Sequence, residues 1–253
     1  MARREGHGWW PYLVPLFSFL VILSVAAKLP GVVRPWVLPL QVLLPAALFL
    51  FYWRRGEYAE LRGYPDRGWA AWLDFGVGVL GGAVWMAPYV VLAWGGEGSF
   101  AFWPEIFRPD PEEAFDPGML GPSLAGLALT LRCIGYGVVT PFVEELFVRS
   151  FLPRYAEVFD TDRDFRDVPI AHYSVRSLAV VLVFFTVSHV IWEWPVAVLW
   201  ILATQAWFYY RKQLGALVMV HAGSNLSIFF TVWALSGRIH DRSGLPIDLW
   251  FFV

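Results

Sequence analysis

The stretch from Pro141 to Phe151 reads P-F-V-E-E-L-F-V-R-S-F, and it ends an apolar run that begins at Ser123. A run of this length can cross a bilayer as a helix, because about 20 apolar residues span the hydrocarbon core. Two glutamates and an arginine near its end cost at least about 2.5–3.5 kcal/mol each at membrane depth unless they are paired or reach water. The stretch therefore predicts a membrane helix with a paired or hydrated polar group at one end.

The composition of the whole chain supports a membrane protein. Of its 253 residues, 58% are hydrophobic and only 16% are charged, whereas soluble domains carry about 25% charged residues. The mean hydropathy is +0.53. The formal net charge is -2 and the bases form no stripe, which argues against nucleic acid as a partner.

Seven apolar runs are long enough to be expected as transmembrane helices. They are Trp9–Ala27, Trp36–Trp53, Trp69–Trp94, Ser123–Phe151, Val175–Ile191, Pro195–Tyr210 and Leu214–Leu235. The predicted fold class is therefore all-α, a polytopic membrane bundle of about seven transmembrane helices, or eight if one run is divided. We expect a single integral membrane domain over residues 1–253.

The positions of Arg and Lys predict a cytoplasmic N-terminus. With that orientation, the inner segments carry thirteen basic residues: Arg3, Arg4, Arg54, Arg55, Arg62, Arg67, Arg149, Arg154, Arg163, Arg166, Arg176, Arg211 and Lys212. The outer segments carry five: Lys28, Arg34, Arg108, Arg238 and Arg242. This excess follows the positive-inside rule. The preference for Arg over Lys and the compact build favour a bacterial inner (plasma) membrane, so the lipid bilayer is an expected partner.

Spacing within the fourth run predicts one ion pair and one unpaired acid. Glu145 and Arg149 are one helical turn apart and are expected to pair, whereas Glu144 lies about 100° further round the helix. Pro141 is expected to kink or restart the helix, because it cannot donate to the helical ladder. Three glycines are expected to let a neighbouring helix approach closely: Gly126, Gly135 and Gly137.

Polar side chains also occur inside two later runs. His189 lies in F-F-T-V-S-H-V-I-W-E, with Glu193 one turn later. The segment V-M-V-H-A-G-S-N-L places His221 and Asn225 four residues apart, on one helical face. Three helices thus supply carboxylate, imidazole and carboxamide groups, the set that can activate a water molecule and stabilise an oxyanion.

These residues resemble the three-motif signature of the CPBP family, which comprises CAAX proteases and bacteriocin-processing enzymes and is also called the Abi family. The matching motifs are Glu144-Glu145-x-x-x-Arg149, Phe185-x-x-x-His189 and His221-x-x-x-Asn225, in that order. The resemblance covers a motif-bearing core of about residues 123–235. It implies an intramembrane endopeptidase and leaves the substrate open.

The resemblance also implies catalytic roles. Glu144 would act as general base on a water molecule that His189 helps to hold, and the resulting hydroxide would attack a peptide carbonyl. His221 and Asn225 would donate hydrogen bonds to the developing oxyanion.

Four further residues are expected to support this site. Glu145 with Arg149 would hold the helix and orient Glu144, and Phe185 would pack beneath the site. For Glu193 two interpretations stay open: it fixes the tautomer of the imidazole in the second motif, or it lies at the outer membrane interface.

Zinc is an alternative to a metal-free mechanism. Glu144, His189 and His221 form a set of two histidines and one carboxylate, of the kind that holds catalytic zinc with an open position. In that case Glu145 or Glu193 would have to serve as the base. No H-E-x-x-H motif is present, and we prefer the interpretation that requires no cofactor.

Two other classes of function share some of these features. A transporter also places carboxylates and imidazoles on broken helices, but it predicts repeated halves, which the sequence does not show. A catalytically inactive scaffold would bind membrane peptides through the same fold.

The preferred partner is a membrane-associated peptide or protein substrate, such as a leader, a sorting tail or a CAAX-like terminus. The sequence does not indicate an oligomeric state or a role for the acidic external loop from Gly95 to Gly118.

Overall fold

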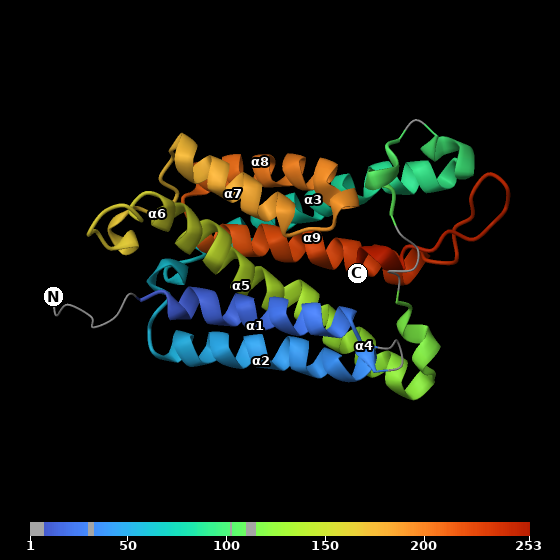
Figure 1. Cartoon of the computed structure of the whole chain (residues 1–253), viewed down its shortest axis with the longest axis horizontal. Helices are drawn as coiled ribbons and strands as arrows, with labels where there is room; N and C mark the ends of the chain where they lie inside the picture. The colour runs from blue at the N-terminus through green and yellow to red at the C-terminus, as the bar shows by residue number, and fades with distance from the viewer. Residues whose placement is uncertain (1–7, 30–32, 102, 110–114) are drawn as a thin grey trace.

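The computed structural model of the protein describes residues 8–29, 33–101, 103–109 and 115–253. These residues form a helical bundle without β-strands, whose helices run mostly along its long axis (Figure 1). The bundle consists of α1 (Trp10–Ala27), α2 (Arg34–Arg54), α3 (Gly68–Trp94), a continuous helix made of α4 to α6 (Pro122–Ala156), α7 (Val175–Val187), α8 (Trp194–Arg211) and α9 (Leu214–Leu235). Each predicted apolar run overlaps one of these helices, which confirms the all-α bundle.

Four of the described helices are long and apolar enough to cross a membrane: the Trp36–Arg54 part of α2, α3, Pro122–Ala156 and α9. Two others, α1 and α7, are shorter apolar helices. The hydropathy of α8 is lowered by Thr204, Gln205 and several aromatic residues with polar ring groups. Both Thr204 and Gln205 are buried, so the polar groups of these two residues face the protein interior.

Connections gather at the two ends of the bundle. The loops at 55–67 and 157–174 lie at one end, and the described segments 95–101, 103–109, 115–121 and 236–249 lie at the other (Figure 1). The basic residues of the 55–67 and 157–174 loops belong to those that the sequence predicts to face the cytoplasm. Which side of a membrane each end faces stays a prediction.

The helix that carries Glu144 continues through Pro141 without a restart. Two π-helical segments, Gly135–Val139 and Leu146–Phe151, flank α5 (Thr140–Glu145). The backbone N–H of Thr140 bonds to the carbonyl of Gly135, five residues earlier. Wider turns of this kind let a helix accommodate a proline, and they occur often at functional sites.

The run around His189 ends earlier than predicted. Instead of reaching Ile191, α7 stops at Val187, and a 3₁₀ turn (Ile191–Glu193) leads into α8. The hydroxyl of Ser188 and the ring of His189 both bond to the carbonyl of Phe185. These side-chain bonds satisfy a carbonyl at the end of α7 and favour its termination there.

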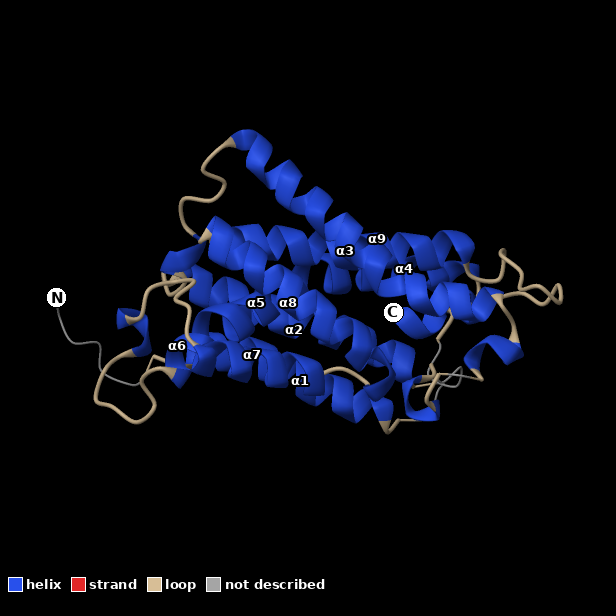
Figure 2. Ribbon diagram, turned by 90° about the horizontal axis from the view of Figure 1, so that it is seen from above, coloured by secondary structure: helices blue, strands red, loops and turns tan. Residues whose placement is uncertain are grey.

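Helices α3 and α9 pack most closely, and Figure 2 shows them side by side. A Cβ atom at Gly78 would lie 2.0 Å from the carbonyl oxygen of Val220, and one at Gly223 would lie 2.3 Å from that of Phe75. Only glycine fits such backbone contacts. This packing fixes the depth and rotation of α9, and it therefore sets where the helix places His221.

The glycines of the fourth run meet different surroundings. A Cβ atom at Gly135 would lie 2.7 Å from Val42, and one at Gly137 would lie 2.3 Å from Leu226. These contacts confirm the predicted close approach at both positions. The prediction for Gly126 was wrong: a Cβ atom there would meet no atom of another described element within 4 Å, because this part of α4 faces outward.

Candidate active site

The centre of the candidate site is an imidazole between two adjacent carboxylates. His221 Nδ1 lies 2.8 Å from Glu145 Oε1, and His221 Nε2 lies 3.8 Å from Glu144 Oε2. The side chains of Glu145 and His221 are 2% and 7% exposed, whereas that of Glu144 is 21% exposed. Consecutive positions on α5 thus place one acid inside the bundle and the other at its accessible edge.

The geometry assigns the tautomer of His221. A carboxylate accepts hydrogen bonds, so the short contact to Glu145 places a proton on Nδ1. Nε2 then faces Glu144 across a gap longer than a direct hydrogen bond. Glu145 is therefore bonded to His221, and its expected role in orienting Glu144 stays a prediction.

Arg149 contacts the carboxylate oxygen of Glu145 that does not bond to His221. The predicted ion pair is present, with Arg149 Nε 3.4 Å from Glu145 Oε2, and both side chains are buried. Arg149 also donates from Nη2 to Thr204 Oγ1 at 2.6 Å and from Nη1 to Gln205 Oε1. Sequence reasoning missed both acceptors on α8, although two adjacent polar residues inside an apolar run were a usable signal.

His189 stands at the end of α7 with its ring fixed by its own helix. Its Nδ1 lies 2.7 Å from the carbonyl oxygen of Phe185, so Nδ1 is the donor and Nε2 is left for other partners. The ring lies 4.4 Å from that of Phe185, which packs directly beside the imidazole. Trp194 Nε1 donates to the His189 carbonyl at 3.1 Å, which ties the turn to the start of α8.

Glu193 is bonded to an indole of α3. Its Oε1 accepts a hydrogen bond from Trp85 Nε1 at 3.3 Å, while the Phe185 carbonyl bonds to Nδ1 of His189. Both interpretations of Glu193 stay predictions. The neighbouring Trp192 packs against Tyr89, whose hydroxyl donates to the Trp192 carbonyl. The turn between α7 and α8 is anchored to α3 by these bonds.

Trp200 on α8 links the second and third motifs. Its ring stacks on Phe185 at 5.1 Å and meets His221 edge to face at 5.3 Å. Its Nε1 donates to Ser224 Oγ at 3.1 Å. This buried indole forms a wall behind the site, and sequence reasoning did not find it because Trp is common in the runs.

Asn225 is directed at the backbone of the long helix. Its Nδ2 donates to the carbonyl of Tyr136 at 2.7 Å, in the π-helical segment that precedes α5. Tyr136 O is thus satisfied by a side chain from α9. The carboxamide keeps a second N–H, because an asparagine amide has two donors.

The donor set for a metal is not assembled in this geometry. Among the residues that the structure describes, no group of three His, Cys, Asp or Glu side chains is arranged to hold a metal ion. Glu144, His189 and His221, all of which are described, are therefore not arranged as a ligand set in this geometry. A role for zinc stays a prediction.

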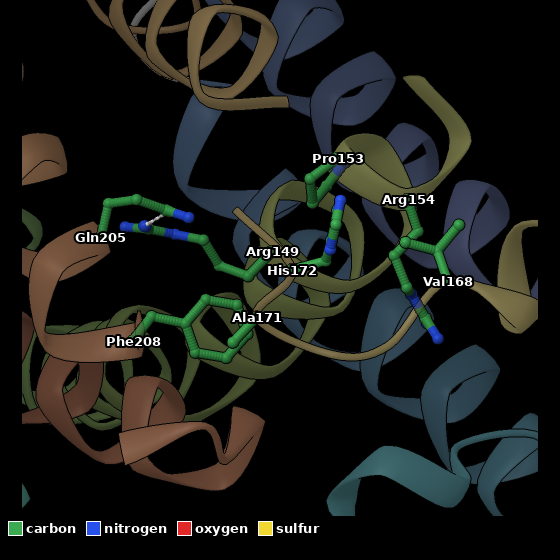
Figure 3. Close-up of a pocket in the computed structure, with 8 residues that line it drawn as sticks. All are labelled: Arg149, Pro153, Arg154, Val168, Ala171, His172, Gln205 and Phe208. Carbon is green, nitrogen blue, oxygen red and sulfur yellow. Dashed lines mark hydrogen bonds between the residues drawn. The ribbon is translucent and has the colours of Figure 1, made fainter. Parts of the chain in front are cut away.

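A small pocket adjoins the clamp around Arg149 (Figure 3). Its volume of about 10 Å³ is that of about one water molecule. It is lined by Arg149, Pro153, Arg154, Val168, Ala171, His172, Gln205 and Phe208. Figure 3 shows Gln205 and Arg149 bonded at one side of this space. The pocket lies beside the supporting residues, and Glu144 does not line it.

Comparison with known proteins supports the signature read from the motifs. Residues 126–227 match the family model described as type II CAAX prenyl endopeptidase Rce1-like, which is part of the CPBP family. The match includes all three motifs. No curated protein and no solved structure matches the chain.

Proposed function

We propose that this chain, whose residues 126–227 match the Rce1-like model of the CPBP family, is an endopeptidase that hydrolyses a peptide bond of a membrane-associated protein or peptide. One observation carries the proposal. Glu144 is the accessible acid of an adjacent pair, and it faces an imidazole whose other nitrogen bonds to the buried acid, Glu145. A carboxylate held beside an oriented imidazole is suited to general acid–base work on water.

Hydrolysis can proceed with Glu144 as the proton carrier. Glu144 takes a proton from a water molecule, and the water oxygen forms a bond to the carbonyl carbon of the substrate. The π electrons of the carbonyl move to its oxygen, giving a tetrahedral oxyanion. Glu144 then returns the proton to the leaving nitrogen, the C–N bond breaks, and a carboxyl and an amine terminus result.

Two histidines and an asparagine are proposed to assist this reaction. His189, with Nδ1 committed to the Phe185 carbonyl, offers Nε2 to the attacking water. The second N–H of Asn225 is the proposed donor to the oxyanion, and a protonated His221 Nε2 would add another. Asn225 and His221 share one face of α9, so a single helix would position both donors.

The mechanism is proposed without a metal, and the substrate is proposed to be a leader, a sorting tail or a CAAX-like terminus. We further propose a bacterial inner membrane as the location. The helix that carries Glu144 ends at Ala156 and leads directly into the 157–174 loop (Figure 1). With that end cytoplasmic, the scissile bond would approach from the inner leaflet.

The test is cleavage of membrane peptides by the full chain in proteoliposomes. Candidate peptides are presented with a prenylated cysteine near the C-terminus, or as an unprenylated apolar leader, and products are identified by mass spectrometry. Glu144→Gln is expected to abolish cleavage, because an amide cannot accept the proton. Asp162→Asn is the matched control, since this exposed acid lies in the 157–174 loop and should leave cleavage unchanged.

The two other classes give different results in the same experiment. A transporter would move solute in a Glu144-dependent way without producing fragments. A scaffold would bind the peptides and release them intact. Cleavage that persists in Glu144→Gln would contradict the proposed role of this residue.

A further inference from the structure

Helix α8 contributes no residue to the three motifs, yet two of its side chains hold the arginine of the first motif. Thr204 and Gln205 are 5% and 2% exposed, and Arg149 is 1% exposed. The three residues lie fully inside the bundle, between α8 and the π-helical segment that follows α5. Buried polar groups at such a position are costly unless each is bonded.

The hydroxyl of Thr204 is directed by its own helix. It donates to the Trp200 carbonyl at 2.8 Å, and a hydroxyl has only one hydrogen. Its lone pairs are thus left for Arg149, whose Nη2 donates to it at 2.6 Å. Gln205 Oε1 accepts from Nη1 of the same guanidinium. Each terminal nitrogen of Arg149 therefore has its own acceptor on α8.

The contact of Arg149 with Glu145 is longer than its hydrogen bonds to α8. Arg149 Nε and Glu145 Oε2 are 3.4 Å apart, and neither atom has a hydrogen-bond partner within the described part of the chain. The guanidinium is planar and rigid. Fixing both terminal nitrogens therefore sets the direction of Nε, and with it the position of the charge that faces Glu145.

We infer that Thr204 and Gln205 are positioning residues for the active site, acting through Arg149 and Glu145 on the tautomer of His221. The chain of contacts runs from the two α8 acceptors to Arg149, from Arg149 to Glu145, and from Glu145 Oε1 to His221 Nδ1 at 2.8 Å. Arg149 holds the Glu145 carboxylate in place. Glu145 in turn keeps the proton of His221 on Nδ1, so that Nε2 faces Glu144.

Charge balance supports this assignment. Glu145 and Arg149 neutralise each other inside the bundle, which leaves His221 Nε2 facing Glu144 alone. If the guanidinium turned away, two neighbouring carboxylates would face one imidazole with no cation beside them. The two uncharged acceptors on α8 hold Arg149 without competing with Glu145 for its charge.

The experiment compares the double variant Thr204→Val/Gln205→Met with wild type in the full chain. The replacements keep the side-chain volumes and remove both acceptors. Histidine-directed ¹⁵N NMR reports the tautomer of His221, with its signals identified by their loss in His221→Gln. We expect a wild-type spectrum of an Nδ1–H tautomer and a changed protonation pattern in the double variant. An unchanged His221 spectrum would overturn the inference.

Kinetics give a second readout, which rests on the proposed function. The double variant is expected to lower kcat by about a hundredfold, as small misplacements of catalytic groups do, to shift the pH profile of kcat, and to leave KM unchanged. Thr204→Ser, which keeps the hydroxyl, should retain wild-type kcat. Wild-type kcat and pH profile in the double variant would contradict a positioning role.

Matched controls come from two positions outside the site. Thr130 makes the same hydroxyl bond to its own helix, to the Gly126 carbonyl at 2.8 Å, but is exposed on α4. Thr130→Val and Gln41→Met on α2 should change neither the spectrum nor kcat.

Two further outcomes remain decisive. If the double variant does not fold, Gln205→Glu takes its place: it keeps the volume and draws the guanidinium away from Glu145 by charge, so a wild-type spectrum of His221 in this variant would overturn the inference. If the wild-type chain cleaves no peptide, the proposed function fails, while the His221 spectrum still decides whether α8 positions the imidazole.

Discussion

Glu145 Oε1 and His221 Nδ1 are joined by a hydrogen bond of 2.8 Å between α5 and α9, 76 residues apart in the chain. This bond connects the first and third motifs and makes the buried acid of the Glu-Glu pair the residue that orients the imidazole. The other acid, Glu144, is partly exposed, and its Oε2 lies 3.8 Å from His221 Nε2. Adjacent glutamates thus contact different nitrogens of one imidazole because a helix turns by about 100° per residue.

The buried ion pair should affect stability strongly when only one partner is removed. Arg149→Met leaves Glu145 buried without its cation, and we expect a loss of about 3–5 kcal/mol. The double variant Glu145→Gln/Arg149→Met should recover part of that loss, because no charge is then left unpaired. Thermal unfolding in detergent micelles measures both.

A surface pair provides the comparison for this prediction. Arg176 and Asp160 form an ion pair at 3.7 Å with half-exposed side chains, so Arg176→Met should cost at most about 1 kcal/mol. Equal losses for Arg149→Met and Arg176→Met would show that the buried pair carries no special stability.

The glycine contact between α3 and α9 should be intolerant of even one methyl group. Gly78→Ala would place Cβ 2.0 Å from the Val220 carbonyl oxygen, which forces the helices apart and displaces His221. We expect a lower melting temperature and loss of cleavage together. Gly76→Ala on the same helix is the control, since its Cβ would meet no other described element within 4 Å. A Gly78→Ala protein with wild-type stability would contradict the packing described.

Metal dependence separates the two mechanisms weighed from the sequence. The metal-free proposal predicts that a chelator such as EDTA or 1,10-phenanthroline leaves cleavage unchanged. It also predicts that purified protein carries no stoichiometric zinc. Metal analysis of wild type and of Glu144→Ala, His189→Ala and His221→Ala is the direct measurement. Bound zinc in the wild type that is lost in all three variants would establish the metal site instead.

Sidedness can be tested with single cysteines. In a Cys133→Ser background, Asp162→Cys reports on the 157–174 loop and Ser243→Cys on the 236–249 loop; both native residues are exposed. With the N-terminus cytoplasmic, a membrane-impermeant maleimide added to intact cells should label position 243 and spare position 162. The reverse pattern would invert the assigned orientation.

The sequence by itself determined the helices and the identity of the motif residues. Apolar runs of membrane-spanning length fix the positions of the helices, because the backbone must satisfy its own hydrogen bonds in lipid. The spacing of Glu145 and Arg149 fixed their pairing within one helix, since residues four apart share a face. These are local properties, because each depends only on residues that are near one another in the sequence.

The tertiary structure decided which atoms meet across helices. The end of α7 at Val187, the bond from Glu145 to His221, the bond from Asn225 to the Tyr136 carbonyl and the part played by Thr204 and Gln205 all depend on helix depth and rotation. Those quantities follow from side-chain packing between distant segments, such as the contact of Gly78 with α9. Spacing along one helix carries no information about them, because the same helical face can meet any of several neighbours.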